Sequence, residues 1–219
     1  MWQNLLSIFL ESRCPMCDRT TEKIVCIYCD RKLRSYQVPQ RERFWRQKIP
    51  LFPWGKYDGQ LKQAIAKMKY EKQPAIARML GQWLGEAWID SAIAQRRLMP
   101  IAKTRNISVI PIPLHRERQK TRGYNQAEII ARGFCQVTGY SMQAQGLRRQ
   151  RNTKAMYDLK PTERSKNLQN AFAIGKKKPK SPILLIDDIY TTGSTTTEAI
   201  RVLEKHQIEV LGVLVTSKA

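Results

Sequence analysis

Two adjacent carboxylates and a hydroxyl-rich turn form the strongest chemical pattern in the sequence. A hydrophobic run, residues 183–186, ends at Asp187 and Asp188, and small residues then lead into a helical pattern. Backbone N–H groups of such a turn, at the positive end of a helix dipole, suit a phosphate. Carboxylates accept hydrogen bonds from vicinal sugar hydroxyls. We therefore expect Asp187 and Asp188 to bind ribose hydroxyls. The residues expected around a 5'-phosphate are Thr191, Thr192, Gly193, Ser194 and Thr195. The alternative is a plain strand–turn–helix with a Thr/Ser cap.

Four cysteines form the second pattern, as two C-x-x-C pairs separated by eight residues. The cysteines are Cys14, Cys17, Cys26 and Cys29. This spacing lets four thiolates converge tetrahedrally on one zinc ion. A single pair could be a redox pair, but two in tandem favour a metal. Because the protein would fill all four positions, we expect the zinc to be structural. The fifth cysteine, Cys135, is expected in the core.

The string ILLIDDIYTTGST, residues 183–195, resembles the fingerprint of the type I phosphoribosyltransferases. That fingerprint has four hydrophobic residues, two acids, and then a hydrophobic residue with a Thr/Gly-rich loop. The resemblance implies that the segment binds phosphoribosyl diphosphate together with magnesium. It places Asp187 and Asp188 on the ribose and residues 191–195 around the 5'-phosphate.

Longer segments resemble the ComF family, also called the competence protein F or ComFC family. These are MKYEKQPAIARMLG (68–81), VIPIPLHRERQKTRGYNQAEIIA (109–131) and LKPTERSKNLQNAFAI (159–174). With the four-cysteine module they cover nearly the whole chain. The resemblance implies a phosphoribosyltransferase-like fold behind a small zinc finger. It also implies a link to natural transformation, in which bacteria import single-stranded DNA.

The family resemblance extends to a loop that holds pyrophosphate in such folds. It falls here on Leu114, His115 and Arg116. The family motif continues with Arg118, Arg122, Asn125 and Gln126. Guanidinium groups suit phosphate oxygens because their donors form a planar fork. The alternatives are a surface histidine and an ordinary basic surface loop.

One segment departs from the family pattern. The family commonly shows Thr-x-x-Gln-x-x-Leu, and this chain reads TKAMYDL, with Met156 in place of the glutamine. We expect this segment in or near the flexible lid of the fold. The chain therefore lacks the side-chain amide that the family places there.

The charge of the chain favours anionic partners. Lys and Arg number 39 against 18 Asp and Glu, which gives a net charge of +21. Such a field attracts nucleic acid, phosphorylated metabolites or an anionic membrane face. Basic clusters interleave with aromatic residues, which favours single-stranded DNA. The candidate nucleic-acid contacts are Arg118, Arg122, Arg148, Arg149 and Arg151. The alternative is a set of solvated faces with core aromatics.

Helical and strand patterns alternate along the chain from about residue 51. Helical patterns cover residues 59–70, 74–95, 125–139 and 196–206, and a short one begins at 162. Strand patterns cover residues 107–113, 182–187 and 208–216. This alternation predicts an α/β fold with a mostly parallel sheet flanked by helices. We expect a phosphoribosyltransferase-like domain over 51–219. Residues 1–50 are expected to hold an N-terminal helix, the zinc module and a basic connector.

The sequence contains no run near the ~18–20 consecutive apolar residues of a membrane span. Its first fourteen residues, MWQNLLSIFLESRC, lack the basic region and cleavage site of a signal peptide. They suit a short amphipathic helix, so we expect a cytoplasmic protein without a transmembrane segment.

These patterns favour a protein that binds phosphoribosyl diphosphate and assists the uptake of single-stranded DNA. Other DNA-uptake proteins would then be further partners. An active phosphoribosyltransferase and a regulator that senses phosphoribosyl diphosphate are the alternatives. The sequence names no acceptor, so catalytic turnover stays open.

Overall fold

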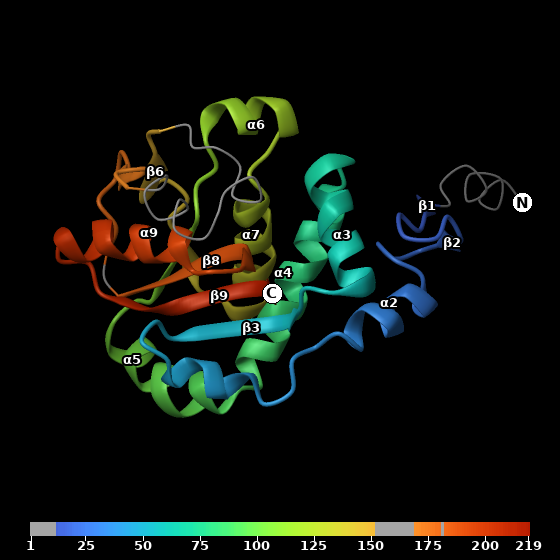
Figure 1. Cartoon of the computed structure of the whole chain (residues 1–219). Helices are drawn as coiled ribbons and strands as arrows, with labels where there is room; N and C mark the ends of the chain where they lie inside the picture. The colour runs from blue at the N-terminus through green and yellow to red at the C-terminus, as the bar shows by residue number, and fades with distance from the viewer. Residues whose placement is uncertain (1–11, 152–168, 181) are drawn as a thin grey trace, which may run out of the picture.

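A five-stranded parallel sheet forms the centre of the molecule. The computed structural model describes residues 12–151, 169–180 and 182–219. The strand order is β3-β9-β8-β4-β5, and every neighbouring pair is parallel. Figure 1 shows β3, β9 and β8 side by side. The strands are β3 (Leu51–Lys56), β4 (Ser108–Pro111), β5 (Ser141–Met142), β8 (Ile183–Tyr190) and β9 (Val210–Lys218). The predicted α/β fold with a mostly parallel sheet is confirmed.

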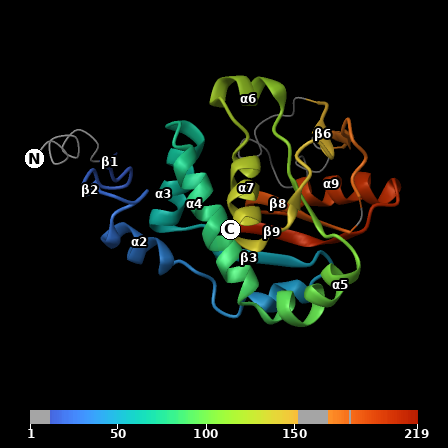
Figure 2. The same ribbon diagram turned by 180° about the vertical axis from the view of Figure 1, so that it is seen from behind.

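Helices cover both faces of this sheet. One face packs against α3 (Gly59–Tyr70), α4 (Pro74–Ile89) and α7 (Gln126–Thr138), and Figure 2 shows α4 and α7 in front of the strands. The other face packs against α9 (Ser194–Lys205). Side chains alternate along β8, so Leu184 and Ile186 enter the first core while Ile183 and Leu185 enter the second.

Shorter elements surround this core. They are β1 (Ser12–Arg13), β2 (Thr20–Thr21), α2 (Ile27–Arg34), η1 (Arg41–Arg46), η2 (Ala94–Leu98), α5 (Met99–Thr104), α6 (Arg116–Arg122), β6 (Leu147–Arg149) and β7 (Phe172–Ile174). The helical pattern expected over 74–95 breaks after Ile89. Among the described residues, no helix has both the length and the apolar composition that crossing a bilayer requires.

Three expectations fall largely or wholly outside the described residues. These are the amphipathic helix at the N-terminus, the short helix from residue 162, and the segment around Met156.

The four-cysteine module and the connector pack against the main core. Leu33 of α2 is fully buried, and the guanidinium of Arg34 lies 4.3 Å from the ring centroid of Trp83 on α4. Trp45 of η1 lies 5.4 Å from Trp88, centroid to centroid. The two parts of the chain thus share one core. We propose the domain boundary after residue 50 from the sequence pattern alone.

Helices α4 and α7 approach each other closely at two glycines. A Cβ atom at Gly81 would lie 2.1 Å from the carbonyl oxygen of Ile130. At Gly133 it would lie 2.4 Å from the carbonyl oxygen of Arg78. This close crossing fixes the position of α7, whose N-terminal end reaches the carboxyl end of the sheet.

Candidate functional site

A cavity lies at the carboxyl end of the parallel strands, where open α/β sheets bind ligands. Its volume is ≈ 330 Å³. The structure brings residues from several of the predicted groups into its lining. They are Asp187, Asp188, Thr191 and Thr195, with Leu114, Arg118, Arg122 and Arg149. The predicted phosphate turn and part of the predicted basic set thus share one cavity.

Lys69 supplies a charge in this cavity that the sequence patterns did not single out. Its ammonium nitrogen lies 2.5 Å from Oδ2 of Asp188, and both side chains are largely buried. Lys69 is near the end of α3, where the Tyr124 hydroxyl donates to the carbonyl oxygen of Met68. The family-like segment MKYEKQ contains the lysine, but only the folded chain shows its partner.

The pKa values of the two aspartates are shifted in opposite directions. Burial, followed by the charge of Asp188, raises the pKa of Asp187 well above its usual value. Burial alone would also raise the pKa of Asp188, but the charge and hydrogen bond of Lys69 outweigh it and lower that pKa. The ligand-free site thus holds one ion pair, Asp188 with Lys69, beside a second acid whose pKa is shifted in the opposite direction.

We expect Asp187→Asn to stabilise the ligand-free protein, increasingly so as the pH rises. Because folding raises the pKa of Asp187, its stabilisation is complete below the ordinary carboxyl pKa and is lost as pH rises through the raised value. Asparagine is neutral throughout and suffers no such loss. Thermal unfolding midpoints of both proteins, measured from acid to neutral pH, test this. For a chain of this size, each kcal/mol of added stability raises the midpoint by about 2–4 °C. An equal difference between variant and native protein at every pH would contradict it.

The turn after β8 combines a glycine in the left-handed region with two closely spaced hydroxyls. Gly193 adopts φ 75°, and a Cβ there would lie 2.2 Å from the Tyr190 hydroxyl. The hydroxyls of Thr192 and Ser194 lie 2.9 Å apart. Helix α9 begins at Ser194, and the first amides of a helix have no carbonyl partner within it. The turn therefore presents hydroxyls and helix-end amides next to the cavity.

Three arginines supply positive charge to the same cavity. Burial, together with the charge of Arg118, lowers the pKa of Arg149 to about 10, while Asp187 acts in the opposite direction. Arg122 donates to the side-chain oxygen of Gln126 and lies 5.7 Å from the ring centroid of Tyr70. An anion entering the cavity would meet these guanidinium groups.

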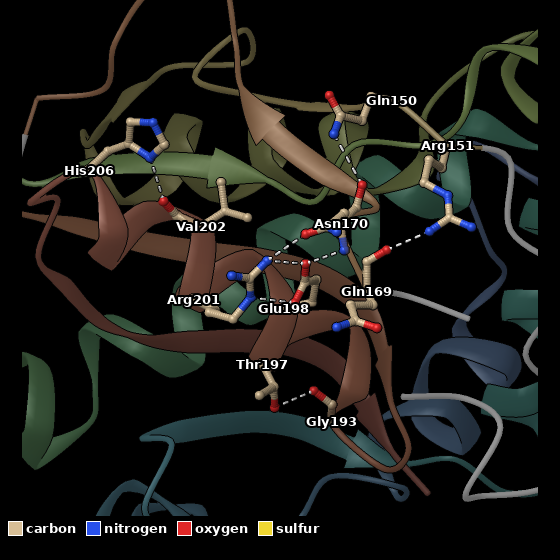
Figure 3. A network of polar contacts seen from close by, with 10 residues as sticks. All are labelled: Gln150, Arg151, Gln169, Asn170, Gly193, Thr197, Glu198, Arg201, Val202 and His206. Carbon is tan, nitrogen blue, oxygen red and sulfur yellow. Dashed lines mark hydrogen bonds and ion pairs between the residues drawn. The ribbon is translucent and has the colours of Figure 1, made fainter. Parts of the chain in front are cut away.

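Other predicted residues lie outside the cavity lining. His115 caps α6, because its Nδ1 accepts the N–H of Glu117 at 3.3 Å, and Arg116 is the first residue of that helix. Arg148 donates to the carbonyl oxygen of Ile174 at 3.2 Å. Arg151 donates to the carbonyl oxygen of Gln169 at 2.8 Å, in the network around Glu198 and Arg201 that Figure 3 shows.

The four-cysteine cluster could hold a metal ion. Its sulfur atoms all lie within 4.8 Å of one another, and those of Cys17 and Cys26 are 3.5 Å apart. Tetrahedral thiolates at about 2.3 Å from zinc would be roughly 3.8 Å apart. Cys14 lies beside the β1–β2 ribbon, and Cys29 lies in the first turn of α2. The donor set and spacing therefore fit a closed structural site.

These features define an α/β protein with an anion-suited cavity at the end of a parallel sheet and a four-cysteine module. No family model matches the chain. It is 28% identical over 217 residues to competence protein F of Haemophilus influenzae, covering 95% of this chain and 91% of that protein. Identity to competence protein ComFC of Bacillus subtilis is 26%, covering 88% and 78%. The DNA utilization protein YhgH of Escherichia coli is 24% identical, covering 87% and 83%. The chain thus resembles members of the ComF family over most of its length.

A solved structure, that of Leishmania donovani UMP synthase, is similar at 18% identity and a TM-score of 0.36. The match covers 71% of this chain and 24% of that one, so the chain spans about a quarter of that protein.

Proposed function

We propose that this protein takes part in DNA uptake, and that it binds both phosphoribosyl diphosphate and single-stranded DNA. Its relatives named for competence and DNA utilization support the role in DNA uptake. The observation that carries the ligand proposal is that Asp187 and Asp188 line the same cavity as Thr191 and Thr195 of the turn and three arginines.

Each part of the cavity has a chemical counterpart in phosphoribosyl diphosphate. Asp187 and Asp188 accept hydrogen bonds from the ribose hydroxyls, and the turn donates to the 5'-phosphate. Arg118, Arg122 and Arg149 provide planar donors for the diphosphate oxygens. Magnesium, held with the diphosphate and near the carboxylates, would supply further positive charge.

Phosphoribosyl diphosphate with magnesium is expected to raise the midpoint of thermal unfolding, because it binds the folded state alone. The double variant Asp187→Asn with Asp188→Asn removes the charged acceptors, so the ligand-induced shift should disappear. A matched control is Glu22→Gln with Glu204→Gln, which removes two exposed carboxylates elsewhere. An undiminished shift in the aspartate variant would place the ligand elsewhere and overturn this assignment.

Single-stranded DNA is expected to bind without strong sequence preference, and its affinity should fall steeply as salt increases. The reason is that lysine and arginine side chains release counterions from the DNA phosphates. Arg118→Glu with Arg122→Glu should weaken binding at least tenfold in fluorescence anisotropy with a labelled oligothymidylate.

The matched control for this charge reversal is Arg96→Glu with Arg97→Glu. Both arginines are exposed on η2. The Arg105–Glu209 ion pair places the neighbouring α5 at the amino end of β9, far from the cavity. Equal weakening by the two double variants would show that binding follows net charge and does not use the cavity.

We also propose that the four-cysteine cluster binds one structural zinc ion. The support is the convergence of four sulfur atoms on one point, with three of the four cysteines buried.

A further inference from the structure

We propose that phosphoribosyl diphosphate and single-stranded DNA bind in the same cavity and exclude each other, so that the metabolite releases the DNA. This inference rests on the proposed function and adds a regulation of that site. The sequence did not predict how close the arginines lie to the carboxylates, and the structure places both in one cavity.

The first argument is that the two ligands need the same cations. Arg118, Arg122 and Arg149 line the cavity together with Lys69 and the two aspartates. A diphosphate group and a nucleic-acid backbone both bind through contacts between phosphate oxygens and guanidinium or ammonium groups. A guanidinium that holds one of these ligands cannot make the same contacts with the other.

The second argument is size. The cavity volume of ≈ 330 Å³ is near the lower end of the roughly 300–1,000 Å³ of small-molecule sites. It has room for one phosphorylated pentose. A nucleotide of a bound strand would occupy the volume that the ribose and diphosphate require.

The third argument is that the two ligands differ in the remaining contacts that they make. The ribose of phosphoribosyl diphosphate offers vicinal hydroxyls to Asp187 and Asp188. Deoxyribose within a DNA strand has no such pair of hydroxyls, so the strand depends on the cations. Tyr57 and Tyr70, which also line the cavity, offer ring faces on which bases can stack. Substitution of the aspartates should therefore weaken binding of phosphoribosyl diphosphate but not of DNA, whereas substitution of the arginines should weaken binding of both.

The test is a competition measured by fluorescence anisotropy of a labelled oligothymidylate on the full-length protein. Magnesium is kept fixed, and sodium chloride keeps the ionic strength constant as phosphoribosyl diphosphate is added. Mutual exclusion multiplies the apparent Kd for DNA by one plus the ratio of metabolite concentration to its own Kd. The apparent Kd should thus rise about tenfold at roughly ten times that Kd.

Two variants make the result specific. Asp187→Asn with Asp188→Asn should bind DNA at least as tightly as the native protein, because it removes negative charge beside the arginines. Its DNA affinity should no longer respond to the metabolite. The control Glu22→Gln with Glu204→Gln should respond like the native protein.

The outcomes distinguish this inference from the function on which it rests. If the metabolite shifts thermal unfolding but leaves the DNA Kd unchanged, mutual exclusion is wrong and the proposed function stands. If the metabolite produces no thermal shift, or DNA does not bind, the corresponding part of the proposed function fails and mutual exclusion fails with it. Continued displacement of DNA in the aspartate variant would also overturn the inference.

Discussion

Replacing Cys26 by serine is expected to abolish metal binding by the four-cysteine cluster and to unfold the surrounding module. A hydroxyl is a far weaker zinc ligand than a thiolate, and structural zinc contributes about 10–16 kcal/mol to the folding of small zinc domains. Cys26 is buried in the same core as Val25 and Leu33, so loss of the site also disturbs packing. Elemental analysis should give about one zinc per native chain and almost none in the variant.

The matched control is Cys135→Ser, which changes the one cysteine outside the cluster. Cys135 is half-buried on α7, and burial raises the pKa of its thiol to about 12. This variant should keep its zinc and lose only modest stability. Native protein without zinc, or full zinc in the Cys26 variant, would show that the cluster is not the metal site.

Replacing Gly81 by valine should destabilise the α/β core by about 3 kcal/mol or more. The new side chain would drive into the backbone of α7, because even its Cβ would lie 2.1 Å from the carbonyl oxygen of Ile130. Overpacking of this kind typically costs about 1–3 kcal/mol, and a backbone neighbour cannot move aside as a side chain can. The thermal midpoint should fall by about 6–12 °C.

Ala75→Val introduces the same side chain on an exposed part of α4 and serves as the control. It should change the midpoint little, since it tests only the lower helix propensity of valine. If both variants changed the thermal midpoint by a similar small amount, α4 and α7 could move apart with little loss of stability, and the prediction would be wrong.

Periodic segments of the sequence predicted the centre of the fold well. Strand β8, the turn and helix α9 follow from a hydrophobic run, two acids and an amphipathic pattern. Strand β3 was missed because Pro53 and Gly55 are unfavourable in strands. Proline in sheets occurs mainly on edge strands, and β3 is at the edge of the five-stranded sheet.

The segment of residues 116–122 was treated as a loop and is the helix α6. Its signals are local: His115 caps the first turn, and Gly123 ends the helix with φ 88°. These signals were overlooked because the segment is strongly basic and buries no side chain, so it lacks the apolar stripe by which a helix is usually predicted.

The composition of the cavity could be predicted only in part. The acids and threonines of the β8–α9 turn lie close together in sequence, between residues 187 and 195, so a local pattern identifies them. Lys69 pairs with Asp188 across 119 residues of chain, and no local pattern reports such a contact. The same holds for the arginines, since Arg149 lines the cavity while its neighbour Arg148 bonds to Ile174.

The packing of the connector bears on how the chain can be shortened. Trp45 packs against Trp88 at a tilted angle and fills the space over Gly212, where a Cβ would lie 2.3 Å from the Trp45 ring. A protein cut after residue 50 would lose this indole and leave apolar surface on α4 and β9 open to water. Exposed apolar surface of that kind promotes self-association. Trp45 and the connector that carries it therefore keep apolar surface of the α/β domain away from water.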